Sequence, residues 1–169
     1  MLNIKKNNLC VIGLGYVGLP LAIEFGKRRN VIGFDINKRR IDELKKSTDT
    51  SLEVSNDEFK KSSHLQFTNN INDIKDCEIF IVAIPTPIDE MKKPDLSLLR
   101  ECCEMIGSFI KKNDLIIFES TVYPGATEEV CIPIMENKSN LVYNVDFYCG
   151  YSPERINPGD KVHRVSTIK

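Results

Sequence analysis

The chain has 169 residues, enough for one domain with a substantial core, and 23 lysines and arginines against 24 aspartates and glutamates give a net charge of −1. This near-neutral balance argues against nucleic-acid binding, and a content of 41% hydrophobic and 28% charged residues excludes a disordered chain. The apolar runs are too short for a membrane span or a signal peptide, so we expect a cytoplasmic protein without membrane partners.

Short apolar segments alternate along the chain with charged, helix-like segments. Buried strands between helical crossovers predict an α/β, Rossmann-like doubly wound fold, in which a mostly parallel six-stranded sheet carries helices on both faces. The polar segment 48–63 is left unassigned, and Pro133 is expected to bend or end the last helix. The expected strands are 9–14, 31–35, 65–68, 79–84, 115–119 and a part of 143–151, and the expected helices are 16–29, 37–47, 71–75, 96–111 and 127–135.

A glycine-rich turn follows the first expected strand and opens the first expected helix. Its sequence, Gly13-Leu14-Gly15-Tyr16-Val17-Gly18, is the GxGxxG pattern in the context that dinucleotide-binding folds require. Gly13 permits the tight turn, Gly15 lets a pyrophosphate approach the backbone, and Gly18 allows the helix to pack closely on the strand. The phosphates then meet the free N–H groups of the helix. We predict that a dinucleotide cofactor contacts Gly13, Gly15, Tyr16, Val17 and Gly18.

Asp35 ends the second expected strand, 22 residues after Gly13. An acid at this point accepts hydrogen bonds from the adenosine ribose hydroxyls and repels a 2′-phosphate, which favours NAD over NADP. Arg39 and Arg40 follow closely and weaken the inference, because an arginine can bind a 2′-phosphate. The alternative for Asp35 is a turn or capping residue. We predict NAD as the cofactor.

The six cysteines do not form a metal-binding pattern. Cys102 and Cys103 are adjacent, the other four are scattered, and the sequence has no CxxC motif or Cys/His cluster. We therefore expect no metal site, and we interpret the cysteines as small buried apolar residues.

Four motifs in order along the chain resemble the UDP-glucose/GDP-mannose dehydrogenase family. They are GLGYVGLP at 13–20, PTP at 85–87, ESTVYPG at 119–125 and YSPERINPG at 151–159. The resemblance runs from about residue 8 to the end of the chain. The last motif looks most like the branch that oxidises UDP-N-acetylhexosamines in Vi-type and O-antigen polysaccharide synthesis.

The resemblance implies roles for individual residues. Thr86 falls in the family's Pro-Thr turn against the cofactor, Thr121 resembles a threonine near the nicotinamide that helps position water, and Glu154 resembles a glutamate that orients or activates that water. Arg40 looks like the family's basic residue beside the adenosine ribose and phosphate. The purely structural alternatives are capping or turn roles for Thr121 and Glu154 and a solvated helix position for Arg40.

Two residues depart from the family pattern. Glu119 stands where many relatives carry lysine, and Pro158 stands where the UDP-glucose branch has a second glutamate. These departures argue against UDP-glucose as the substrate. Cys149 is not expected to be a nucleophile, because its neighbours do not match the family's glycine-rich cysteine motif.

The reaction that the resemblance implies is the oxidation of a sugar C6 alcohol to a carboxylate with two NAD⁺. In the family a cysteine traps the aldehyde, and water hydrolyses the resulting thioester. The family's catalytic lysine and cysteine, its central helix and its UDP-binding domain come later than residue 169. We therefore expect 1–169 to be a truncated NAD-binding domain that binds NAD(H) weakly and is inactive alone. Full-length relatives are expected to be homo-oligomers that pair through the central helix.

Two other functions remain open at this point. A stand-alone NAD-binding module would have a sensing or regulatory role without chemistry of its own. Another Rossmann dehydrogenase, such as a 3-hydroxyacyl-CoA type, would explain the glycine-rich turn but not the segments 119–125 and 151–159 together.

Overall fold

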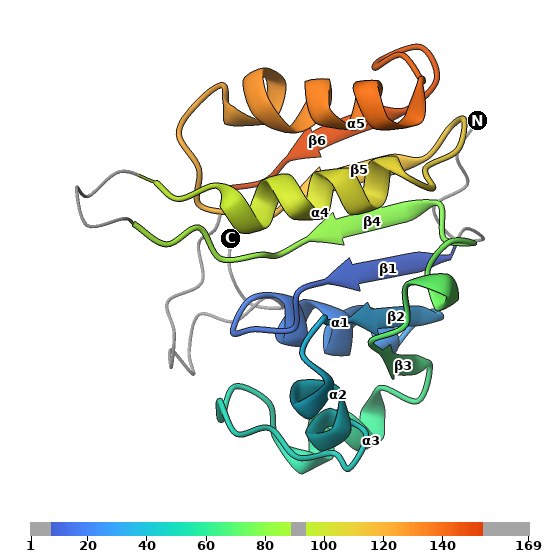
Figure 1. The fold of residues 1–169 in the computed structure, drawn as a ribbon. Coiled ribbons are helices and arrows are strands. Elements are labelled where there is room, and N and C mark those ends of the chain that lie inside the picture. The colour runs from blue at the N-terminus through green and yellow to red at the C-terminus, as the bar shows by residue number, and fades with distance from the viewer. Residues whose placement is uncertain (1–7, 89–93, 154–169) are drawn as a thin grey trace.

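A computed structural model describes residues 8–88 and 94–153, and within them six strands form one sheet (Figure 1). The strands are β1 (Leu9–Ile12), β2 (Val31–Phe34), β3 (Leu65–Thr68), β4 (Ile79–Val82), β5 (Leu115–Phe118) and β6 (Tyr148–Tyr151). They lie in the order β3-β2-β1-β4-β5-β6, and all five pairings are parallel. This is the strand order of the dinucleotide-binding Rossmann fold, which confirms the predicted fold class.

The sheet is buried on both faces at its centre. All four residues of β1 and all four of β4 are buried. Along β1 the side chains alternate between two separate hydrophobic clusters, with Leu9 and Val11 in one and Cys10 and Ile12 in the other. A strand with two buried faces reads as a continuous apolar run, and this explains why these strands were recognisable from the sequence.

Two groups of helices supply these clusters. Leu19, Ile41 and Phe59 come from three helices that cover the face of Leu9 and Val11, whereas Leu99 and Met135 come from two helices on the opposite face (Figure 1). The helices are α1 (Gly18–Gly26), α2 (Lys38–Leu44) and α3 (Asn56–Lys61) on the first face, and α4 (Ser97–Gly107) and α5 (Ile132–Ser139) on the second. Short helical turns η1 (Ile71–Asp73) and η2 (Thr127–Cys131) complete the described elements.

The helix α3 lies inside the segment that the sequence analysis left unassigned. A capping box starts it: the Ser55 N–H donates to the Glu58 carboxylate at 2.9 Å, and Phe59 is the buried residue that packs the helix onto the sheet. A serine followed three residues later by glutamate is a known sequence signature of a helix start. The signal was therefore present, but a single turn and a half of mostly polar residues has too little apolar periodicity to show it.

Pro133 does not end the last helix, contrary to one of the two expected outcomes. Residues Thr127–Cys131 form a turn of π-helix, α5 then begins at Ile132 with Pro133 in its first turn, and the helix runs on to Ser139. Helical backbone is continuous from the π-turn through Cys131 into α5, so the proline is accommodated where the helix changes from π to α spacing. The change from π to α spacing thus resolves the conflict that the sequence posed.

Candidate cofactor-binding site

The glycine-rich turn lies at the carboxyl end of β1, next to β4, where the winding of the sheet reverses direction. Gly13 has φ +87°, and a Cβ atom there would lie 2.7 Å from the Ala83 carbonyl oxygen. A Cβ on Gly18 would lie 1.8 Å from the Gly13 carbonyl oxygen. These two glycines are therefore required by the fold itself, whether or not a ligand is bound.

Gly15 differs from both. No heavy atom lies within 4 Å of the place where its Cβ would be. The space beside Gly15 is left open at the point where α1 begins, and the free N–H groups in the first turn of a helix attract anions. An open approach to the backbone at a helix N-terminus is what a pyrophosphate needs, so the turn fits the predicted dinucleotide.

Asp35 connects β2 to the glycine-rich turn. One carboxylate oxygen accepts the Leu14 N–H at 2.9 Å, and the other accepts the Asn37 N–H at 2.9 Å. Asp35 therefore does serve as a turn residue, as the alternative interpretation held. Each oxygen keeps a further lone pair, so the same carboxylate remains able to accept hydrogen bonds from ribose hydroxyls.

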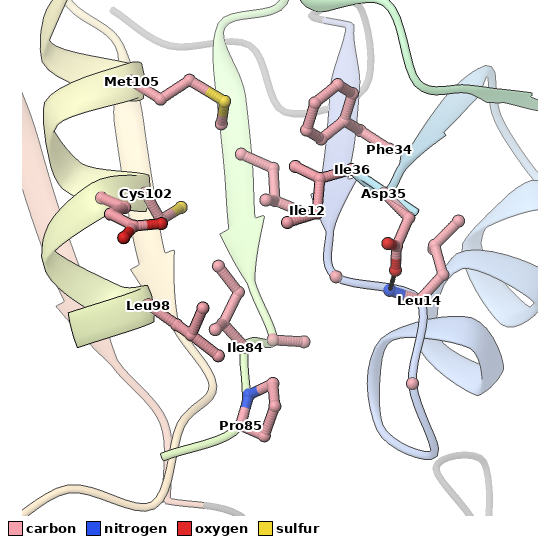
Figure 2. A pocket seen from close by; sticks show the side chains of 14 residues that line it. Ile12, Leu14, Phe34, Asp35, Ile36, Ile84, Pro85, Leu98, Cys102 and Met105 are labelled. Carbon is pink, nitrogen blue, oxygen red and sulfur yellow. Dashed lines mark hydrogen bonds between the residues drawn. The ribbon is translucent and has the colours of Figure 1, made fainter. Parts of the chain in front are cut away.

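A cavity of about 480 Å³ opens at the carboxyl ends of β1, β2 and β4. Figure 2 shows Leu98, Cys102 and Met105 of α4 facing Phe34 and Asp35 across this cavity. Most of its lining is apolar, with Asp35 and Glu101 as its acidic side chains. A mostly apolar cleft with few polar groups suits a flat aromatic base with a ribose at one end. No motif of the sequence pointed to these α4 residues, although Leu98, Cys102 and Met105 follow a helical spacing.

Arg40 is not a solvated helix residue. Only 13% of its side chain is exposed, and its Nε donates to the Leu14 carbonyl at 2.9 Å. Its guanidinium also pairs with Glu43 and with Asp49, the latter at 2.8 Å. The structure thus places Arg40 against the glycine-rich turn, as expected of a residue near the adenosine ribose, but with two carboxylates already bound to it.

The two threonines of the site come together at the ends of β4 and β5. The Thr86 hydroxyl donates to the Thr121 carbonyl oxygen, and the Ser120 hydroxyl donates to the Ile84 carbonyl at 3.0 Å. Thr121 lines a smaller hollow of about 70 Å³ together with Tyr16, Val17 and other residues of these strand ends. Glu154 lies outside the described residues.

Residues 7–169 match the NAD-binding domain of the UDP-glucose/GDP-mannose dehydrogenase family. The chain belongs to this family. Its NAD-binding domain is the part that matches, which confirms NAD as the cofactor predicted from the glycine-rich turn and Asp35.

Individual relatives place the chain within the UDP-glucose/GDP-mannose dehydrogenase family. It is 59% identical over 98% of its length to the UDP-N-acetyl-D-glucosamine 6-dehydrogenase of Pseudomonas aeruginosa, and 52% identical over its whole length to that of Salmonella typhi. Among solved structures, the UDP-D-ManNAc dehydrogenase of Pyrococcus horikoshii is 32% identical, with a TM-score of 0.82 over 90% of this chain and 37% of its own. The chain spans 39% and 40% of the two curated relatives.

The cysteines of this family member are buried within the described residues, apart from the half-buried Cys149. Burial raises the pKa of Cys102 to about 12 and that of Cys149 to about 12, so both are thiols at neutral pH. A protonated thiol is a poor nucleophile. Across residues 8–88 and 94–153 no three His, Cys, Asp or Glu side chains are grouped so as to hold a metal ion. Nor does any helix there have the length and apolarity to cross a bilayer.

Proposed function

We propose that the chain is the NAD-binding part of a nucleotide-sugar 6-dehydrogenase. The overall reaction converts the C6 alcohol of a UDP-sugar to a carboxylate: the alcohol, two NAD⁺ and one water give the uronate, two NADH and three protons. The observation that carries the proposal is the 59% identity to a UDP-N-acetyl-D-glucosamine 6-dehydrogenase across nearly the whole chain. It favours a UDP-N-acetylhexosamine as the substrate, used for a capsule or O-antigen polysaccharide.

The residues of the site support this proposal by their placement. NAD⁺ supplies the hydride acceptor. The open backbone at Gly15 would hold the pyrophosphate, and Asp35, which lines the apolar cavity, would accept hydrogen bonds from the ribose hydroxyls. Thr121 follows β5 and lines the smaller hollow together with Tyr16 and Val17, so these residues would face the nicotinamide half of NAD⁺ if its pyrophosphate were held at Gly15.

Thr121 and Glu154 are proposed to handle the water that completes the second oxidation. The Thr121 carbonyl oxygen already accepts the Thr86 hydroxyl, which fixes the backbone at this point and leaves the Thr121 hydroxyl available to orient a water molecule. A glutamate in a partly desolvated site is a suitable base for that water. These roles rest on the family motif and on the place of Thr121 in the fold.

The first experiment measures cofactor binding by the 169-residue chain. Titration with NADH, followed by its fluorescence and by calorimetry, is expected to show weak but saturable binding. A folded sample that binds no NADH at millimolar concentration would contradict the proposal. We also expect no turnover of UDP-sugars by the 169 residues alone, so NADH formation that Glu154→Ala abolishes would show that expectation to be wrong.

The second experiment concerns the substrate and uses the complete gene product. UDP-N-acetylglucosamine, UDP-N-acetylgalactosamine, UDP-glucose and GDP-mannose are each offered with NAD⁺, and NADH and uronate are quantified. Two NADH per uronate with a UDP-N-acetylhexosamine is the expected result. A preference for UDP-glucose or GDP-mannose would refute the substrate while leaving the dehydrogenase function intact.

A further inference from the structure

The guanidinium of Arg40 is surrounded by acceptors from three segments of the chain. Its Nε donates to the Leu14 carbonyl at 2.9 Å, its Nη1 to Glu43 and to Asp49, and its Nη2 to the Ser51 hydroxyl at 3.3 Å. An arginine has five N–H donors. Four of them are directed at these protein acceptors, so at most one is available to a ligand.

This count limits what Arg40 can bind. The strong arginine–phosphate contact is bidentate and uses two parallel N–H groups. Arg40 cannot offer two unless one of its protein partners is removed. Glu43 is the simplest partner to remove, since its side chain is 17% exposed and its other hydrogen bonds come from Thr50.

The two carboxylates that hold Arg40 are charged at neutral pH. The hydrogen bond from Arg40 lowers the pKa of Glu43. Burial by itself would raise the pKa of Asp49, but hydrogen bonds from the Ser51 hydroxyl, from Arg40 and from the Val54 N–H together bring this pKa below its ordinary value. Two negative charges therefore face the single positive charge of Arg40.

Asp49 is fixed in place independently of Arg40. Its side chain is fully buried, and its oxygens accept the N–H groups of Ser51 at 3.1 Å, Glu53 at 2.9 Å and Val54 at 3.0 Å. A carboxylate held by this many backbone donors does not follow the arginine if the arginine moves. The position of the Asp49 carboxylate is thus set by the chain around it.

This arrangement lies directly beside the predicted ribose site. Leu14 gives its N–H to Asp35 and accepts Arg40 at its carbonyl oxygen, so Asp35 and Arg40 bind the two ends of one residue. A 2′-phosphate on the adenosine ribose would bring close to two negative charges to Asp35. Arg40 contacts the same residue, Leu14, that Asp35 contacts, and four of its five donors are already engaged by the protein.

We propose that Glu43 and Asp49 are specificity-determining residues, which restrict the site to NAD(H) by occupying the guanidinium that an adenosine 2′-phosphate would need. The proposal rests on the cofactor binding proposed above. Asp35 repels the 2′-phosphate, and the two carboxylates on Arg40 withhold the compensating charge. If only Asp35 is neutralised, Arg40 is still occupied; if only Glu43 is removed, Asp35 still repels the phosphate. The effects of the two substitutions on NADPH binding are therefore coupled.

A double-mutant cycle tests this coupling. Dissociation constants for NADH and NADPH are measured for the unmodified chain, Asp35→Asn, Glu43→Ala and the double variant. We expect each single variant to change NADPH affinity by no more than about threefold, and the double variant to bind NADPH about tenfold more tightly than the product of the single effects. The two NADH constants for Glu43→Ala and the unmodified chain should agree within about threefold.

Asp42→Ala is the matched control. Asp42 precedes Glu43 on α2 and pairs with the exposed Lys38, so its removal deletes one negative charge from the same helix without touching Arg40. Asp35→Asn combined with Asp42→Ala should show no coupling. Additive effects in the Glu43 cycle, or an equal gain in the Asp42 cycle, would overturn the proposal. Failure of the unmodified chain to bind NADH would instead overturn the proposed function, and circular dichroism establishes that each variant is folded.

Discussion

Replacing Gly15 by alanine should remove cofactor binding without harming the fold. The added Cβ meets no heavy atom within 4 Å, and the backbone of Gly15 does not have the positive φ that strains other residues. Alanine at such a position stabilises a protein by about 0.4–1 kcal/mol, because it restricts the unfolded chain. For a chain of this size that is a rise of about 1–4 °C in Tm.

The same methyl group fills the space that a pyrophosphate needs beside the start of α1. Charge-assisted hydrogen bonds contribute about 1.5–3 kcal/mol each, so losing two of them weakens binding by about 3 kcal/mol or more. This corresponds to about a hundredfold rise in the Kd for NADH. The fold and the binding should therefore respond to one methyl group in opposite directions.

Thermal unfolding by circular dichroism and NADH titration by calorimetry measure the two effects on the same sample. Gly18→Ala is the control, because its Cβ would lie 1.8 Å from the Gly13 carbonyl oxygen and must displace backbone. We expect Gly18→Ala to lower Tm strongly and Gly15→Ala not to lower it. The reasoning would be refuted if Gly15→Ala had a lower Tm than the unmodified chain, or if it bound NADH with the same Kd.

Three further outcomes follow from the described contacts. Burial raises the pKa of Asp114 to about 6 from an ordinary 3.8, so the folded state binds this proton more tightly than the unfolded state. The free energy of unfolding should then fall by on the order of 3 kcal/mol as the pH rises from about 4 through about 6. Asp114→Asn should abolish most of this fall, as measured by urea unfolding, because its amide oxygen can still accept the Lys111 N–H. An unchanged pH dependence in the variant would count against it. Asp49→Ala leaves the buried Arg40 without its main fixed partner and should cost about 3–5 kcal/mol, seen as a lower urea midpoint; a loss below about 1 kcal/mol would contradict the buried pairing. Leu98→Asp places a charge on the apolar wall of the large cavity and should raise the Kd for NADH about tenfold with Tm unchanged, whereas equal affinity would show that the cofactor does not use this wall.

The central part of the fold was predictable because its signals are local. Strands such as β1 and β4 are continuous apolar runs, and the GxGxxG motif marks both the end of one strand and the start of a helix. The place of Asp35 directly after β2 was predictable for the same reason, whereas its contact with a ribose stays a prediction. In each case a single short segment of the sequence is enough to predict the local structure.

Other features depend on contacts between distant segments. The surroundings of Arg40 require Asp49, which lies nine residues away, and the Leu14 carbonyl, which lies 26 residues away. The apolar wall from α4 faces β1 and β2 only after the sheet has assembled. No local sequence pattern predicts such contacts between distant segments. The roles of Thr121 and Glu154 stay predictions.

The division of labour among the three glycines has a consequence for how this motif changes over evolutionary time. Gly13 and Gly18 are constrained by contacts inside the protein, so a descendant that no longer used a dinucleotide would still be obliged to keep them. No protein atom crowds a Cβ at Gly15, so only the proposed ligand would constrain this position, which would otherwise be free to change. A homologue that has lost cofactor binding is therefore expected to keep the two outer glycines and to carry a larger residue at the middle position. That middle position is the one to examine in a homologue suspected of having lost activity.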